Sequence, residues 1–486
     1  MKRMQVIFFV IEAVLIFAIY LSNISFFPLY GLDEALFMNP SCTLAEKGFL
    51  GTPVAASFLG LDKYTFWQPP TYLLLQAAFM YIFECSLFVS RIFSLIAGLF
   101  TLLFVYYIAK NLFGKAPAEW AVMFLAIAPS FFMVSRLARM DVFVSLFLTA
   151  SFYFYIRARQ KQKSFLYVLA GFLAGLGATS HLNGLIIPII YLLIFVFDYK
   201  MHRRAKTAYF FSGLSIPFLV WIAYLSKNIP VFLTQITFQK GVGFGALSIS
   251  EQIANWLKLW NVLGYDLAYS LFLLAGFLYM FRERKHTSLK IMLVALLGYV
   301  HLVKPTIWYV SYAMPFLALS AAATLESVLA KSKTFFLEKY RRIIIIFCLL
   351  CFFVGTNFYA LERHNSYDFE SHKENIYDVI PRNSNATIVG TLQNWVFLKD
   401  SKYVATSYAV RNGSNYLENE EDVFAVMKQV RPRYLIFHNE DMNPLAQEII
   451  LTSLDGRDGV ELKELKRVDC TSCYNGGFVI YGVVWK

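Results

Sequence analysis

The feature that most limits how this chain can fold is a series of long apolar runs that recur through residues 1–360. A helix needs about 20 mostly apolar residues to cross about 30 Å of hydrocarbon. Because 58% of the 486 residues are hydrophobic, a soluble fold would expose large apolar patches. We therefore expect a polytopic α-helical membrane protein with about eleven spans. The predicted spans lie at about 5–24, 88–109, 119–137, 140–157, 165–180, 183–198, 207–226, 263–281, 288–303, 308–328 and 342–360.

Lysine and arginine are concentrated in alternate loops between these runs, and the net charge is +12. In a soluble protein this excess would suggest nucleic acid. Here it predicts topology, because short cytoplasmic loops are enriched in Lys and Arg. We expect a multi-pass protein of the plasma (inner) membrane with its N-terminus inside and no nucleic-acid partner. The basic loops lie at 2–3, 110–115, 157–163, 200–206, 282–290 and 331–342.

Two apolar segments need a separate interpretation. The first run is interpreted as a span and not as a cleavable signal peptide, because residues 21–27 offer no small-x-small cleavage site. The apolar stretch 72–85 follows two prolines and is too short to span. Counting it as a span would also invert every later loop. We therefore expect a helix that lies at the outer interface or enters it partway.

The predicted spans divide the chain into a transmembrane domain, 1–360, and a soluble domain, 361–486. The first outer loop is 25–87, and a second outer region is 227–262. With this number of spans, the soluble domain and any site formed by the outer loops face the extracytoplasmic side. Alternating strand-like and helical pieces predict a small α/β domain. The strand-like pieces are 386–389, 434–437 and 477–484, and the helical pieces are 421–429 and 445–454.

The six cysteines give no sign of a zinc site. Cys42, Cys85, Cys348 and Cys351 are interpreted as packing residues in or near membrane segments. Cys470 and Cys473 form a CxxC pair in the soluble domain. This pair would suit a local disulfide if the domain lies outside the cytoplasm.

Charged residues at the predicted outer helix ends are candidates for a catalytic or binding site. Asp33 and Glu34 follow the first span, where one can act as a general base or bind a sugar hydroxyl or a metal. The alternative is a solvated pair at a helix N-terminus. Arg136, Arg139 and Asp141 lie in a short outward turn and suit a phosphate clamp, or else a salt-bridged cap between two helices.

Further polar residues occur at the same predicted membrane face. Arg91 lies near the outer end of the second span, where it either snorkels or faces the site. His181 and Asn183 lie at the next outer turn, and a single His is often an ordinary polar cap. Lys304 lies at an outer helix end against the positive-inside trend, which a lipid phosphate would explain. Together these turns predict a site at lipid-headgroup depth.

Several stretches, in this order and spacing, resemble glycosyltransferase family 39, the protein O-mannosyltransferases and aminoarabinose lipid A transferases. The similar stretches are GLDEALFMNPSCTLAEKGFLGTP, FWQPPTYLLLQ, SRIFSLIAGLFTLLFVYYIAKNLFG, APSFFMVSRLARMDVFVSLFLTASFYFYIRA, GFLAGLGATSHLNGLIIP and KPTIWYVSYAMPFLAL. The resemblance covers about 1–330. It implies the C-type glycosyltransferase fold, with Asp33 as catalytic base beside Glu34. It also implies a second site acid at Asp141, an arginine at Arg91 and a donor-phosphate partner at Lys304.

The implied function is sugar transfer from a polyprenyl-phosphate donor to a lipid, glycan or protein acceptor, in glycosylation of the cell envelope. With Lys304, four more residues are donor-phosphate or substrate-binding candidates: Arg91, Arg136, Arg139 and His181. Relatives often carry a charged or basic residue where Trp67 and Gln68 precede Pro69 here, so metal use at this site is left open. No cofactor is certain and a divalent metal is not excluded. The alternative is a transporter or flippase of lipid-linked or small solutes, although the acids gather at one face instead of lining a pathway.

Overall fold

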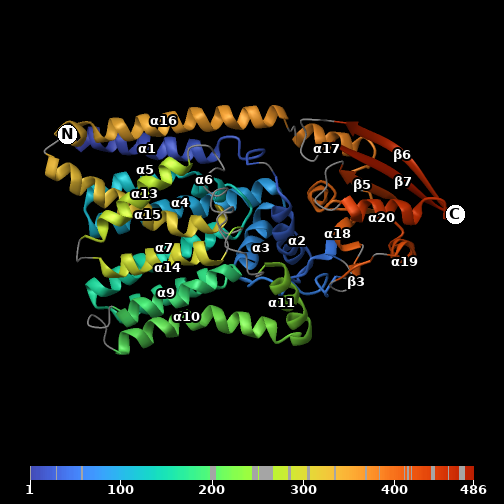
Figure 1. Ribbon diagram of the computed structural model, residues 1–486, viewed down its shortest axis with the longest axis horizontal. Coiled ribbons are helices and arrows are strands. Elements are labelled where there is room, and N and C mark those ends of the chain that lie inside the picture. The colour runs from blue at the N-terminus through green and yellow to red at the C-terminus, as the bar shows by residue number, and fades with distance from the viewer. Residues whose placement is uncertain are drawn as a thin grey trace.

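The computed structural model describes most of the chain. The described residues are 2–28, 30–55, 58–197, 204–243, 250, 266–282, 286–303, 307–332, 335–366, 369–382, 384–409, 411–412, 415–417, 419–438, 444–457, 459–469 and 477–486. Figure 1 shows a bundle of helices at one end of the molecule and a small domain with a sheet at the other. The helices of the first outer loop lie between them.

A helical segment occupies the position of every predicted span. Five of the described helices are long and apolar enough to cross a membrane by themselves, and others are shorter apolar helices. The bundle therefore has the predicted polytopic character. Its helices are α1 (Lys2–Leu21), α4 (Leu87–Leu112), α5 (Lys115–Ala126), α6 (Pro129–Val134), α7 (Asp141–Lys161), α8 (Ser164–Ala178), α9 (Ile186–Phe197), α10 (Arg204–Leu225), α13 (Asp266–Met280), α14 (Thr287–Val303), α15 (Ile307–Ser332) and α16 (Phe335–Ser366).

The third predicted span, 119–137, is not one continuous helix. It is divided into α5 and α6, and Ala128 between them is extended, with φ −71° and ψ 116°. The residue before a proline disfavours the helical region, and Pro129 supplies that constraint. The chain then leaves α6 in a short turn, 135–140, before α7 begins at Asp141. This turn carries two of the arginines that the sequence singled out.

Two glycines explain how closely α8 and α10 approach each other. A Cβ on Gly171 would lie 1.8 Å from Phe210 O, and one on Gly213 would lie 2.0 Å from Val168 O. Such distances exclude any side chain, so the two backbones meet directly. Small residues at a helix crossing favour this kind of packing in a membrane, where van der Waals contact holds the helices together.

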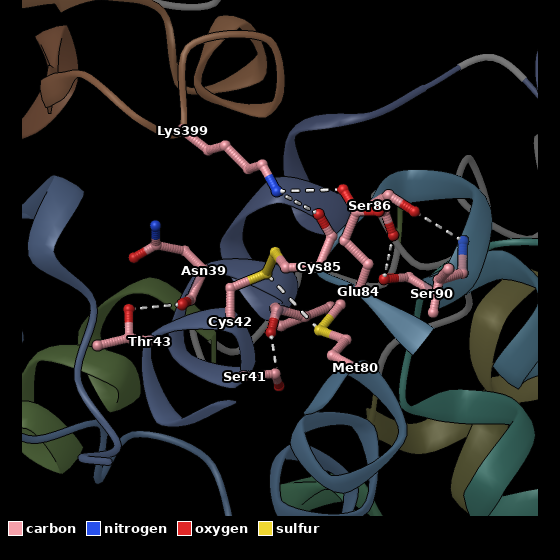
Figure 2. The surroundings of a disulfide bond; sticks show 12 residues. Asn39, Ser41, Cys42, Thr43, Met80, Glu84, Cys85, Ser86, Ser90 and Lys399 are labelled. Atoms are coloured by element: carbon pink, nitrogen blue, oxygen red, sulfur yellow. Dashed lines mark hydrogen bonds and ion pairs between the residues drawn. A yellow bond between two sulfur atoms is a disulfide. The ribbon is translucent and has the colours of Figure 1, made fainter. Parts of the chain in front are cut away.

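The first outer loop folds into two helices, α2 (Leu32–Lys47) and α3 (Thr71–Phe83), which pack on each other. The 13 residues of α3 span only about 20 Å at 1.5 Å per residue, so this helix is too short to cross the bilayer. Figure 2 shows a disulfide between Cys42 and Cys85, whose Cα atoms are 5.6 Å apart. The expectation that these two cysteines only pack was wrong. Separated by 43 positions, they carried no spacing signal.

The C-terminal domain is the predicted small α/β domain. Its sheet has the order β2-β1-β5-β7-β6, with β1 parallel to β2 and β5, and β7 antiparallel to β5 and β6. The predicted strand and helical pieces are all present, and β2 and β6 were missed. Cys470 and Cys473 lie outside the described residues. The elements are α17 (Phe369–Tyr377), β1 (Thr387–Gly390), β2 (Lys402–Ala405), α19 (Glu420–Val430), β5 (Tyr434–His438), α20 (Pro444–Leu454), β6 (Val460–Asp469) and β7 (Gly477–Trp485).

This domain packs on the first outer loop. One buried apolar cluster contains Met38 and Cys42 of α2 together with Leu392 and Trp395 of the C-terminal domain. At the edge of the contact, Lys399 Nζ donates a 2.9 Å hydrogen bond to Cys85 O, beside the disulfide (Figure 2). The disulfide therefore lies under the interface between the two parts of the chain.

Candidate active site

The candidate site forms where the start of α2 meets the 135–140 turn. Asp33 and Glu34 occupy the first turn of α2, whose N-terminal end favours negative charge. Gly31 N donates to Glu34 Oε2 at 3.3 Å, so the Glu34 side chain also caps the helix that carries it. The two carboxylates are adjacent in sequence but have different partners.

Glu34 is enclosed by hydrogen-bond donors. Arg91 donates from Nε to Glu34 Oε1 at 2.9 Å and from Nη2 to Glu34 Oε2 at 2.7 Å. The backbone N–H of Ala138 donates to Oε1 at 2.8 Å. Arg91 uses its Nη1 on Ile24 O at 2.9 Å, and both side chains are almost fully buried, at 0% and 1% exposed. This bidentate pair joins α2, α4 and the 135–140 turn.

Arg136 lies at the C-terminal end of α1. It donates from Nη1 to Ile19 O at 2.9 Å and from Nη2 to Ser22 O and to Phe27 O, the last at 2.8 Å. The last carbonyls of a helix have no partner within the helix and carry partial negative charge. Arg136 Nη1 binds one such carbonyl, Ile19 O, and its Nη2 binds Ser22 O and Phe27 O in the segment after the helix, so this buried guanidinium fixes the chain as it leaves the first span.

Arg139 connects the two aspartates. Its Nη1 donates to Asp33 Oδ2 and its Nε donates to Asp141 Oδ2, the latter at 3.0 Å. Its guanidinium also lies over the Trp308 ring, 4.3 Å from the centroid, in a cation–π contact. Burial lowers the pKa of Arg139, but Asp141 and Asp33 more than offset this and raise the pKa above its ordinary value. Arg139 is therefore charged at any working pH.

The two aspartates differ in exposure. Asp141 is fully buried, and its Oδ1 accepts a 2.9 Å hydrogen bond from the Tyr312 hydroxyl. The Asp33 side chain is 49% exposed, and no described residue donates to its Oδ1. Sequence reasoning missed Tyr312. Its spacing of four from Trp308 puts both on one face of α15, and that spacing was the available signal.

His181 lies beside this group. Burial lowers its pKa to about 4, although Asp141 opposes the shift, so the ring is neutral near pH 7. Its Nδ1 accepts from the backbone N–H of Asn183 at 2.9 Å, which leaves the proton on Nε2. Asn183 in turn accepts from the Tyr299 hydroxyl at 2.6 Å.

A glutamine that the sequence gave no reason to single out holds the loop next to the site. Gln235, in α11 (Ile229–Gly243), accepts from the N–H groups of Phe66 and Trp67 at 2.8 and 3.0 Å. Its amide also donates to Leu59 O and Tyr64 O, at 3.1 and 2.8 Å. With all four bonds made, Gln235 fixes the loop on which Trp67 stacks against Phe37, a residue whose ring lies under Arg139.

The remaining predicted site residue is Lys304, which lies outside the described residues. Among the residues that the structure does describe, no group of three or more His, Cys, Asp or Glu side chains could hold a metal ion. Asp33 and Asp141 are both tied to Arg139, so a metal would have to compete with a guanidinium. The divalent metal stays an open prediction.

Comparisons with known proteins agree with this architecture. Residues 67–226 match the family described as dolichyl-phosphate-mannose-protein mannosyltransferase. At the level of whole sequences, no curated protein matches the chain.

Among solved structures, the fold is similar to ArnT from Cupriavidus metallidurans in the apo state, with TM-score 0.68 and 12% identity over 99% of this chain and 98% of that one. ArnT bound to undecaprenyl phosphate gives TM-score 0.64 over the same shares, also at 12% identity. The apo oligosaccharyltransferase of Archaeoglobus fulgidus gives TM-score 0.60 and 15% identity over 92% of this chain and 71% of that one. The resemblance to glycosyltransferase family 39 is thereby confirmed, and the chain has the C-type glycosyltransferase fold with a small C-terminal sheet domain.

Proposed function

We propose that this protein is a membrane glycosyltransferase that moves a sugar from a polyprenyl-phosphate donor to an extracytoplasmic acceptor, with Asp33 as general base. The observation that carries the proposal is that Asp33 is both held by Arg139 and partly exposed. Arg139 holds one oxygen, and the half-exposed carboxylate keeps the other for an incoming hydroxyl or amine. ArnT, whose fold this chain shares, has been seen with undecaprenyl phosphate, which supports a lipid-phosphate donor.

In the proposed reaction, the acceptor oxygen or nitrogen forms a bond to the anomeric carbon as its proton passes to Asp33. The bond from that carbon to the phosphate oxygen breaks, and the polyprenyl phosphate leaves with the electron pair. A positioned base of this kind contributes about 10²–10⁴-fold. Arg139, held by Asp141 and Trp308, would keep Asp33 oriented.

The net charge of the aspartate–arginine cluster indicates that the donor phosphate needs a further cation. Asp33, Arg139 and Asp141 together carry a net charge of −1 (two carboxylates and one guanidinium), which opposes a phosphate unless a further cation is present. We propose Lys304 as that cation, with the remaining donor of Arg139, Nη2, as a second partner. His181 would contribute a neutral N–H. All three nitrogens of Arg91 already donate hydrogen bonds, and the Nε of Arg136, which has no partner among the described residues, is buried. We therefore assign both arginines and Glu34 to positioning.

The test is direct. Purified protein in liposomes would be given synthetic radiolabelled polyprenyl-phosphate sugars, and release of polyprenyl phosphate would be followed with extracts of envelope lipid, glycan and protein as acceptors. We expect release that depends on the acceptor and is lost in Asp33→Asn. Movement of the intact donor across the bilayer without release would favour the transporter alternative. Labelling of an introduced cysteine at residue 486 in intact cells would test the outward placement of the C-terminal domain and the plasma-membrane location.

A further inference from the structure

A cavity at the opposite end of the bundle has no part in the proposed reaction. It measures about 230 Å³ and is bounded by α1, α4, α5 and α16. On α4, the cavity wall extends from Leu99 to Tyr107, which lie roughly 12 and 24 Å along the helix from Arg91 at about 1.5 Å per residue. None of the wall residues belongs to the Asp33 cluster, so we treat the cavity as separate from that site.

One buried polar atom in this cavity lacks a partner. Glu12 lines the cavity and is only 8% exposed, and its Oε1 has no hydrogen-bond partner within the described part of the chain. Leaving a buried acceptor unsatisfied costs about 1–3 kcal/mol, and more for a charged group. The neighbouring carboxylate, Glu119, is already bonded by Arg341 and Arg342 at 2.9 and 2.6 Å. Glu12 is therefore the acceptor that a ligand would satisfy.

The rest of the cavity is apolar and opens to the side. Its walls are mainly aliphatic, and Ala13, Leu103 and Tyr107 combine a place in the wall with an exposed surface that would face lipid. A volume of this size corresponds to roughly eight water-sized groups, which is a length of alkyl chain and not a whole lipid. A membrane lipid could thus insert a chain while its headgroup stays at the polar end.

The charges at the polar end form a zwitterionic pattern. Glu12 lies within electrostatic range of Glu119, Arg342 and Arg341. On α16, Arg341 is one turn from Ile345, which is in the cavity wall, so both lie on one face. Glu119 uses only the Nε of Arg341, so this guanidinium keeps donors for a phosphate. A headgroup with an ammonium beside a phosphate would match both charges.

We propose that this cavity binds a phospholipid whose headgroup joins a primary ammonium to a phosphate, as in phosphatidylethanolamine. The ammonium donates to Glu12, the phosphate accepts from Arg341, and one chain fills the apolar part. The lipid belongs to the leaflet opposite the Asp33 site. By filling a gap between α1 and α16, it would stabilise the pairing of the first and last helices of the bundle.

The test is native mass spectrometry of the full chain in detergent, titrated separately with phosphatidylethanolamine, phosphatidylcholine and phosphatidylglycerol. We expect phosphatidylethanolamine to bind about tenfold or more tightly than the other two, because only it offers a charged N–H donor. Glu12→Gln should remove that preference, and Ala13→Leu should weaken binding of the lipid by filling the cavity. Glu46→Gln, at an exposed carboxylate of α2, is the matched control.

Equal binding of the three lipids by the unaltered protein would overturn the proposal. So would a preference that survives Glu12→Gln, since the ammonium would then bind elsewhere. The melting temperature of each variant, measured without added lipid, separates loss of the site from loss of the fold. None of these readouts depends on sugar transfer, so the result is independent of the proposed catalytic activity.

Discussion

Asp33 and Glu34 are consecutive carboxylates on one helix, and they lie in opposite environments. Glu34 accepts from Arg91, Ala138 and Gly31 and has almost no exposed surface. Asp33 accepts from Arg139 through one oxygen and is 49% exposed. Successive residues of an α-helix point about 100° apart, so the first turn of α2 directs one acid into the protein and the other towards the open side.

Under the proposed function, this difference in environment separates a structural carboxylate from a reactive one. A carboxylate whose oxygens are all occupied cannot accept a substrate proton without breaking bonds that support the fold. A carboxylate held at one oxygen is oriented and still accessible. Arginines show the same contrast, since Arg91 and Arg136 are committed to the fold, whereas Arg139 serves the half-open aspartate.

The substitution Asp33→Asn should have the largest effect, and it should act on catalysis. This change keeps the shape of the side chain and its bond from Arg139 but removes its basicity. Sugar transfer should fall by about 10²–10⁴-fold, measured as turnover of a radiolabelled polyprenyl-phosphate sugar at saturating donor. The melting temperature should change little, as for the control Glu46→Gln. If more than about a tenth of the turnover remained, the loss of rate would be smaller than a general base contributes. The role of base would then move to Glu34 or Asp141.

Glu34→Gln should act on stability instead. It leaves the fully buried Arg91 without its counter-charge, and breaking a buried ion pair in this way costs about 3–5 kcal/mol. We expect a large fall in melting temperature and in the amount of folded protein. The comparison would fail if Glu34→Gln melted like the unaltered protein yet lost transfer, because Glu34 would then belong to the reaction.

Loss of the Cys42–Cys85 disulfide should have a smaller effect. The bond closes a segment of 43 positions, and removing a disulfide usually costs about 2–4 kcal/mol. Since this one ties α2 to the end of α3 under the C-terminal domain, both melting temperature and turnover should fall in Cys42→Ser with Cys85→Ser. Cys351→Ser, at an exposed free thiol, is the control. An unchanged melting temperature in the double variant would show that the disulfide contributes nothing.

The sequence predicted the parts of this molecule that depend on local pattern. Apolar runs of fixed length located the helices, and the alternation in the soluble domain located three strands of its sheet. It also singled out the acids and arginines that meet where α2 begins and the chain turns at 135–140. It could not distinguish Asp33 from Glu34, because that distinction depends on which residues from α4 and the 135–140 turn surround each one. Tyr312, Gln235 and the disulfide partners were missed for the same reason, since each joins segments far apart in the chain.

The smallest predicted effect concerns a buried cluster of two histidines and an asparagine in the C-terminal domain. His372 and His438 stack with centroids 5.3 Å apart, and Asn394 bonds to both rings. Burial lowers the pKa of His372, and burial followed by repulsion from His372 lowers that of His438 to about 3. In the unfolded chain the pKa of a histidine is near 6.5. Below that pH the unfolded chain therefore binds more protons than the native one. The contribution of these histidines to the free energy of unfolding is fully present above about pH 6.5 and is lost as pH falls towards 3, by on the order of 2 kcal/mol at pH 5.

Trypsin digestion of the full chain at the C-terminal domain, after incubation between pH 7.5 and 5, should report this loss. His438→Gln should flatten the profile because it removes the titrating ring. An equally steep profile in that variant would assign the acid sensitivity to carboxylates elsewhere.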